Sequence, residues 1–156
     1  MKSEIISRIE TCKKEKMPYL DLSGLGMSHL PQEITTLTWL QALSIADNKI
    51  EDIAPLASLP KLHKLSLSHN RIKDLTPLAR LSEMKFLFLH HNHIDNIDVL
   101  ENMPHLKKLV ADHNRIEEIT PLKTLKELVY LDIRENPLKE KERVRQSLPQ
   151  LILCYC

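Results

Sequence analysis

Apolar residues recur along the chain at a fixed interval, and an asparagine stands at the same place in each copy. The shared pattern is LxxLxLxxNxI, in which apolar and other residues alternate before the asparagine. Five asparagines occupy this place, each 22 residues after the one before: Asn48, Asn70, Asn92, Asn114 and Asn136. A fixed step of this size predicts a repeat architecture, in which every copy is one structural unit stacked on the next.

The alternating part of each copy predicts a short β-strand with one buried face. Leu43 and Ile45 are two residues apart, as are Leu65 and Leu67 in the next copy, and side chains at this spacing share one face of a strand. Strands repeated in one direction at a fixed period must lie parallel, about 4.8 Å apart. We expect the asparagines to follow the strands and to bond backbone groups of neighbouring loops, which is a structural role.

The N-terminal end departs from the pattern. Apolar residues at helical spacing predict an amphipathic helix over residues 3–16, and we assign residues 1–17 to an N-terminal helical cap. Residues 18–136 carry the repeats, of which the first is atypical because Leu25 stands where asparagine is expected. Atypical ends are typical of an open stack, whose terminal apolar layers must be covered.

The C-terminal end departs from the pattern as well, after Pro137. We assign residues 137–156 to a C-terminal cap, with a charged helix whose apolar positions are Val144 and Leu148. The segment LILCYC at the end of the sequence is predicted to add a last edge strand. With both caps, the 156 residues form one predicted domain.

Composition and charge narrow the function classes. The formal net charge is +1, so no charge imbalance points to nucleic acid or to a membrane surface. Two glycines in the whole sequence argue against a turn-dense sandwich or barrel. The three cysteines, at positions 12, 154 and 156, are bunched near the ends and do not suggest a disulfide framework. We find neither a signal peptide nor an apolar run of membrane-spanning length, and we expect a cytoplasmic protein.

The longer pattern LxxLxLxxNxIxxIxPLxxL resembles the leucine-rich repeat in its 22-residue form, shared by internalins and a regulatory subunit of protein phosphatase 1. DIAPLASL and DLTPLARL look most internalin-like, and NPLKEKERVRQSLPQL resembles the C-terminal cap of intracellular members without its usual tyrosine. The resemblance covers residues 19–153. It implies an α/β leucine-rich-repeat solenoid with a curved parallel sheet on the concave side, short 3₁₀ or extended convex segments, and helical caps at both ends. For function it implies partner binding.

The two phenylalanines of the sequence fall at outward positions of one central strand. Leu87 and Leu89 already supply the core there, so folding does not require Phe86 and Phe88. Exposed aromatic residues among charged ones have the make-up of a protein-binding hot spot, although they would also serve simply to cover the sheet. The predicted partner-binding residues on the concave face are Phe86, Phe88, Tyr130, Lys64, Lys108, His90, Asp112, Asp132 and Arg134.

The single tryptophan, Trp39, stands at a repeat position that is polar in the regular copies. Either it extends the binding surface towards the rim, or it packs on the first repeat or the N-terminal helix. We favour packing.

Three histidines share one repeat position, directly before the asparagine: His69, His91 and His113. Adjacent strands would bring their imidazole rings roughly 5 Å apart. This spacing suits a metal ion shared by two histidines, or a site that becomes charged near pH 6. The third interpretation is that histidine is merely tolerated there, and on that basis we assign no metal site.

Ser68, His90 and Asp112 occupy neighbouring strands in order, and their types suit nucleophilic catalysis. A parallel sheet face lacks the strained nucleophile turn and the oxyanion donors that such chemistry uses. The lateral spacing across strands is also long for the hydrogen bonds of a triad. We therefore predict no catalytic residues.

The expected function is a non-catalytic protein–protein interaction module that binds a protein partner across its concave face. We expect a monomer without a cofactor. Three alternatives stay open: a regulatory subunit of an enzyme such as a phosphatase, a bacterial effector acting on host proteins, and a self-associating structural module.

Overall fold

Seven three-residue strands form one parallel sheet in the computed structural model, which describes residues 2–156. The order of the strands in the sheet is their order in the chain. Their bounds are β1 (Tyr19–Asp21), β2 (Ala42–Ser44), β3 (Lys64–Ser66), β4 (Phe86–Phe88), β5 (Lys108–Val110), β6 (Tyr130–Asp132) and β7 (Leu153–Tyr155). Leu43 pairs with Leu65 and Leu65 with Leu87, so the register repeats the spacing of the sequence. The predicted parallel strands and the last edge strand are confirmed.

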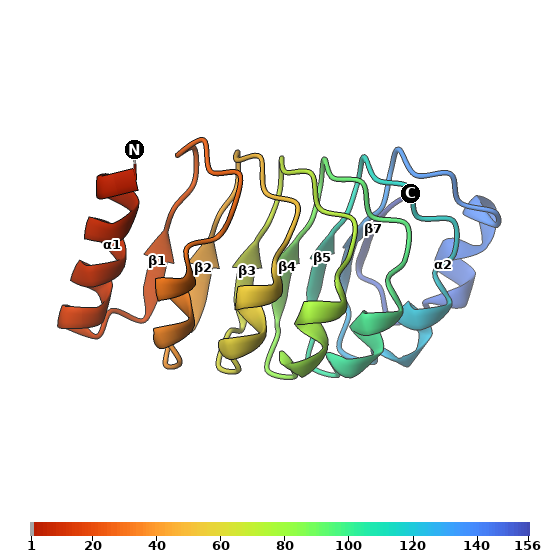
Figure 1. Cartoon of the computed structure of the whole chain (residues 1–156). Helices are drawn as coiled ribbons and strands as arrows, with labels where there is room; N and C mark the ends of the chain where they lie inside the picture. Colours follow the sequence, from red (N-terminus) through yellow and green to blue (C-terminus); the bar gives the residue numbers. More distant parts are fainter. Residues whose placement is uncertain (1) are drawn as a thin grey trace.

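Short 3₁₀ helices lie on the opposite side of the stack from the sheet (Figure 1). Their bounds are η1 (Gln32–Thr36), η2 (Ala54–Ser58), η3 (Thr76–Arg80), η4 (Asp98–Asn102) and η5 (Thr120–Thr124). A proline stands in the first turn of η2, η3 and η5, where its fixed φ suits a helix start and its missing N–H costs no hydrogen bond. The predicted leucine-rich-repeat solenoid with short convex segments is thus confirmed.

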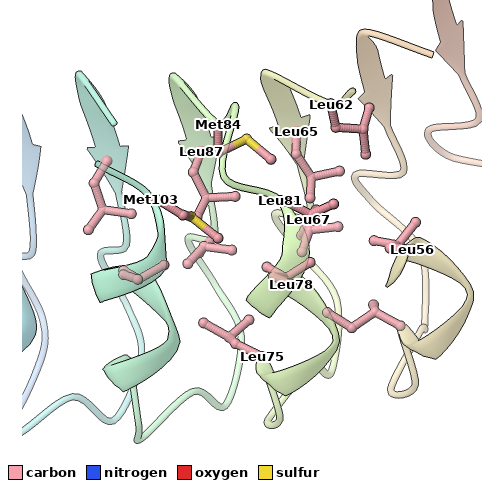
Figure 2. Packing of buried hydrophobic residues seen from close by; sticks show 14 of the residues in the cluster. Leu56, Leu62, Leu65, Leu67, Leu75, Leu78, Leu81, Met84, Leu87 and Met103 are labelled. Atoms are coloured by element: carbon pink, nitrogen blue, oxygen red, sulfur yellow. The ribbon is translucent and has the colours of Figure 1, made fainter. Parts of the chain in front are cut away.

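The core lies between the strands and the 3₁₀ helices (Figure 2). Leu65 and Leu67 come from the sheet side, and Leu75, Leu78 and Leu81 from the convex side of the same repeat. All five are at most 2% exposed. Full burial of one such side chain stabilises the fold by about 2 kcal/mol. An inner repeat buries apolar side chains against a neighbouring repeat on each side. Each end repeat has a neighbouring repeat on one side alone, so a cap must cover the apolar side chains on its other side.

The residue before each asparagine has a left-handed backbone. Asp47, His69, His91, His113 and Glu135 have φ between 51° and 54°. This conformation turns the chain away from the sheet after the strand, towards the convex side. It is uncommon for residues other than glycine, and the chain uses glycine at none of these five positions.

Helix α1 (Lys2–Glu15) covers the N-terminal end of the stack (Figure 1), one residue earlier than predicted at each end. Ile9 and Cys12 from α1 are buried against the first repeat. The predicted packing of Trp39 is confirmed: its Nε1 donates to the carbonyl oxygen of Met17 at 3.1 Å, and Lys16 Nζ lies 3.8 Å from the ring centroid. The described helices include none that is long and apolar enough to cross a membrane.

The C-terminal cap consists of a 3₁₀ turn, η6 (Lys141–Arg143), and a single α-helical turn, α2 (Val144–Ser147), before β7. Val144 and Leu148 are buried as predicted. The helix is shorter than the charged helix we expected. Pro149 disfavours a helical backbone at the residue before it, and Leu148 adopts φ −129° and ψ 68°.

Candidate functional site

The side chains of β4 alternate as the sequence predicts. Leu87 is fully buried, whereas Phe86 is 37% exposed and Phe88 is half-buried on the sheet face. The strand register places Phe86 beside Lys64 on one side and beside Lys108 on the other. The two phenylalanines therefore do lie on the concave face, outside the core.

Lys108 links the aromatic side chains of neighbouring strands. Its Nζ lies 4.0 Å from the ring centroid of Tyr130 and 5.7 Å from that of Phe88. An ammonium group over an aromatic ring is attracted by the electrons of the ring face. The predicted residues Phe88, Lys108 and Tyr130 thus form one contiguous group across β4, β5 and β6.

The aromatic surface continues onto β7 through Tyr155, which our sequence-based prediction missed. Its ring centroid lies 5.9 Å from that of Tyr130, and the guanidinium of Arg134 lies 5.1 Å from it. Burial raises the pKa of Tyr130, and the neighbouring Asp132 and Tyr155 raise that pKa further. The outward register of the last strand, which pairs Tyr155 with Asp132, is the signal that would have identified it.

Asp132 is 5% exposed, which corrects the expectation that it presents a free charge on the surface. Its carboxylate accepts two hydrogen bonds from Arg134, from Nε at 3.0 Å and from Nη2 at 2.7 Å. Burial works against the charged carboxylate, but the hydrogen bonds and charge of Arg134 outweigh it and hold the pKa of Asp132 below its ordinary value. Arg134 is therefore the exposed member of this ion pair, and Asp132 the buried one.

The histidine column is assembled as predicted. The ring centroids of His69 and His91 are 4.3 Å apart, those of His91 and His113 are 4.1 Å apart, and both pairs are stacked. Burial lowers the pKa of His91, and the neighbouring His113 and His69 lower it further. His90 packs edge-on against His69, with a centroid distance of 5.2 Å. Burial lowers the pKa of His90 too, against the opposing charge of Asp112.

The row Ser68, His90 and Asp112 is not assembled as a triad. Ser68 is 4% exposed, and its Oγ pairs with that of Ser66 at 3.1 Å. Asp112 Oδ2 lies 2.7 Å from Nδ1 of His113, so the hydrogen bond of this carboxylate goes to His113 and not to His90. Across residues 2–156, the hydrogen bonds include none that joins the three members of the row.

Two of the hollows among the described residues matter for the predicted site, and they lie on different sides of the molecule. A shallow one of about 480 Å³ lies on the concave face, where Tyr19, Lys64 and Phe88 are among its lining residues. A more enclosed one of about 300 Å³ lies beside the C-terminal cap, where Lys139 bridges Glu117 and Glu118 at 3.0 Å each. The second hollow is lined by none of the predicted partner-binding residues, and the first borders Phe88 directly.

Comparison with known proteins agrees with this geometry. Two family models match, "Leucine Rich repeats (2 copies)" over residues 38–80 and "Leucine rich repeat" over residues 60–116. Together they cover just over half of the chain. None of the curated proteins searched matches the chain.

Solved structures of several repeat proteins superimpose on the chain. An internalin of Listeria monocytogenes has 31% identity and a TM-score of 0.63, covering 81% of this chain and 44% of its own. A leucine-rich-repeat protein of Leptospira interrogans has 22% identity and a TM-score of 0.70, covering 93% and 50%. A plant peptide hormone receptor in complex with RGF2 has 23% identity and a TM-score of 0.71, covering 88% and 24%. This chain thus spans half or less of each of these three proteins.

The family models, the parallel sheet at a 22-residue register and the asparagine column all identify the same repeat. The chain belongs to the leucine-rich-repeat family, which is generally a non-catalytic protein-interaction fold.

Proposed function

We propose that this protein binds a protein partner across its concave face, with Phe86, Phe88 and Tyr130 as anchors. The observation that carries the proposal is the aromatic group around Lys108 on the concave face of the sheet. The hydrophobic core lies on the opposite face and is formed by other residues, so the aromatic group is not needed to complete it. Large aromatic side chains that are partly exposed give much contact area for little lost side-chain entropy.

The backbone beneath this group is rigid enough for recognition without rearrangement. The ladder of hydrogen bonds runs past the strands: Leu67 donates to the carbonyl of Phe88, and Leu89 to that of Val110. A side chain held on such a frame loses little entropy when a partner binds. We therefore expect the partner to meet a preformed surface.

The charged residues around the anchors set specificity and the association rate. Lys64, Lys108 and Arg134 are basic, Asp112 is acidic, and His90 adds a polar ring between them. Mixed signs complement the mixed surface of a protein better than the uniform charge of a phosphate backbone. Asp132 contributes indirectly, because it holds the guanidinium of Arg134 in place.

Partner binding is also the activity that a similar structure displays. The plant receptor was solved in complex with RGF2, so at least one protein of this fold takes a partner. We extend partner binding, and not that partner, to this chain.

The test is a pull-down from native lysate with three baits of matched folding, checked by circular dichroism. The baits are the unchanged chain, Phe86→Ala/Phe88→Ala, and the control Ile152→Ala, which removes an apolar side chain that is 69% exposed outside the aromatic group. We expect a protein held by the unchanged chain and by the control, and lost by the double variant. A partner held equally by all three baits would place the binding surface elsewhere.

The edge of the sheet favours self-association as a second candidate function. Leu153 is 47% exposed and Tyr155 is 41% exposed, both on β7 at the end of the sheet. An edge strand with apolar side chains offers unpaired backbone groups to a second chain, and a lysine there opposes such pairing. Sedimentation of the unchanged chain and of Leu153→Lys tests this: a mass that rises with concentration only in the former supports a dimer through β7.

A further inference from the structure

Two histidines of the column and a neighbouring carboxylate form a cluster at the rim of the sheet. His91, Asp112 and His113 each offer one ligand atom, and these atoms all lie within 4.8 Å of one another. We propose that these three residues bind a late first-row divalent cation such as Zn²⁺, in a site that leaves one coordination position open to solvent.

The backbone fixes the positions from which the three side chains extend. The N–H of His91 donates to the carbonyl oxygen of Asp112 at 3.1 Å, which places these two residues side by side on adjacent repeats. The N–H of Asn92 donates to the carbonyl oxygen of His113, and the left-handed backbone at His91 and His113 sends both rings the same way. The fold therefore sets the backbone spacing of the three ligand residues in the absence of a cation.

The side chains already face one another. The rings of His91 and His113 are stacked at 4.1 Å with 21° between their planes, and Asp112 Oδ2 lies 2.7 Å from His113 Nδ1. Zinc bonds of about 2.0–2.1 Å in a tetrahedral site separate the ligand atoms by about 3.4 Å. Because the nitrogen lone pairs of stacked rings lie in nearly parallel planes, both rings must turn out of the stack to meet one cation. Both histidines are exposed, so their side chains are free to turn in this way. The cation would replace the hydrogen bond between Asp112 and His113.

The donor set selects the class of cation. Two imidazole nitrogens and one carboxylate oxygen suit Zn²⁺ and its neighbours, whereas Ca²⁺ and Mg²⁺ favour oxygen ligands throughout. Three protein ligands leave a fourth position for water or an incoming group. The nearby guanidinium of Arg134 is held by Asp132, so the carboxylate of Asp112 is not already paired with it.

His69 shares the column but not the site. Its ring stacks on His91, on the side away from Asp112, and it is absent from the cluster of ligand atoms among the described residues. His69 is preceded by Ser68, whereas His113 is preceded by the carboxylate residue Asp112. His69 has the same repeat position and the same left-handed backbone as His91 and His113, with φ 53°. It is therefore a matched control.

The test is a calorimetric titration with Zn²⁺ alone, at neutral pH, on the full chain and on His91→Asn, His113→Asn and His69→Asn. Asparagine tolerates the left-handed backbone, so each variant should fold, and circular dichroism checks this. We expect one Zn²⁺ per chain, a loss of affinity of about tenfold or more in His91→Asn and His113→Asn, and a much smaller change in His69→Asn, whose ring contacts His91 without offering a ligand atom to the cluster. Asp112→Asn should lose affinity as the two ligand variants do.

Three results would overturn the site: no heat with the unchanged chain at micromolar concentrations, an equal loss of affinity in His69→Asn, or loss of the heat in Cys154→Ser/Cys156→Ser. The last would assign the cation to the C-terminal thiols. The titration contains no protein partner, so its outcome is independent of whether the concave face binds one.

Discussion

The side-chain oxygen of Asn70 accepts a hydrogen bond from the backbone N–H of Ile50 at 2.9 Å and so ties its own repeat to the preceding one. Its amide nitrogen donates to the carbonyl oxygens of Ile45 and Leu67 at 2.9 and 3.1 Å. These groups are buried, so water does not reach them in the folded chain. The asparagine thus satisfies backbone groups that the turn leaves unpaired.

Replacing Asn70 with alanine should therefore lower the free energy of unfolding by about 3 kcal/mol, because buried backbone groups lose their partners. Urea denaturation followed by circular dichroism measures the change. Asn136→Ala is the matched control: Asn136 makes the same bonds, to Ile116 and Ala111, at a partly exposed place in the last copy. Water can replace some of its bonds, so its loss should be smaller. Equal losses would contradict the role of burial.

The fold was predictable because its information is local and repeated. The step between the asparagines sets the strand register, and the alternation around Leu43 and Leu65 sets which face is buried. The exposure of Phe86 followed from the same alternation. Each of these features depends on residues of one copy and its neighbour, and the same pattern appears in five copies of the sequence.

Features that depend on distant segments or on the backbone path were not predictable in this way. The burial of Asp132 depends on Arg134 folding back over it and on β7 lying alongside. Tyr155 joins the aromatic surface only because the cap returns the chain to the sheet. The left-handed backbone at Asp47 could not be predicted either, because the residue there is not glycine, which is the usual sequence signal for this conformation.

The left-handed position gives a second prediction, at the exposed Glu135, whose φ is 51°. This backbone costs an ordinary residue about 1–2 kcal/mol, and glycine avoids that cost at an entropic loss of about 0.5–1 kcal/mol. Glu135→Gly should therefore raise the free energy of unfolding by roughly 0.5 kcal/mol. Glu135→Val should lower it by about 1 kcal/mol, since β-branched residues are least suited to positive φ. Urea denaturation of both variants checks the order, and a valine variant as stable as the glycine variant would contradict it.

The bond between Asp132 and Arg134 predicts how stability changes with pH. The pKa of Asp132 is depressed in the folded chain, so its contribution is present above the unfolded-state pKa of about 3.9 and is lost as pH falls through the folded-state pKa. In Arg134→Gln, the guanidinium no longer offsets the effect of burial, so the pKa of Asp132 should rise. Acid unfolding should then begin at higher pH than in the unchanged chain.

The measurement is the urea midpoint as a function of pH, from about 7 down to about 2. Arg71→Gln is the control, because Arg71 and Glu51 form an exposed pair 3.9 Å apart whose removal should leave the acid profile unchanged. If both variants shift the profile equally, the effect comes from net charge and not from Asp132.

The single tryptophan predicts that the N-terminal cap can be watched as it unfolds. Trp39 donates a hydrogen bond to Met17, two residues after the end of α1, so its fluorescence should change when the cap detaches. Ile9→Ala at the buried face of α1 should cost about 3 kcal/mol, and this loss falls on an end unit with a single neighbour. We expect the fluorescence transition of this variant to move to lower urea than its circular dichroism transition. The control is Leu148→Ala, at the other end of the stack. It should destabilise the chain, but its fluorescence transition should not precede its circular dichroism transition. If the two signals coincide in Ile9→Ala, the cap and the repeats unfold as one cooperative unit, and the interface between α1 and the first repeat is stronger than one apolar layer provides.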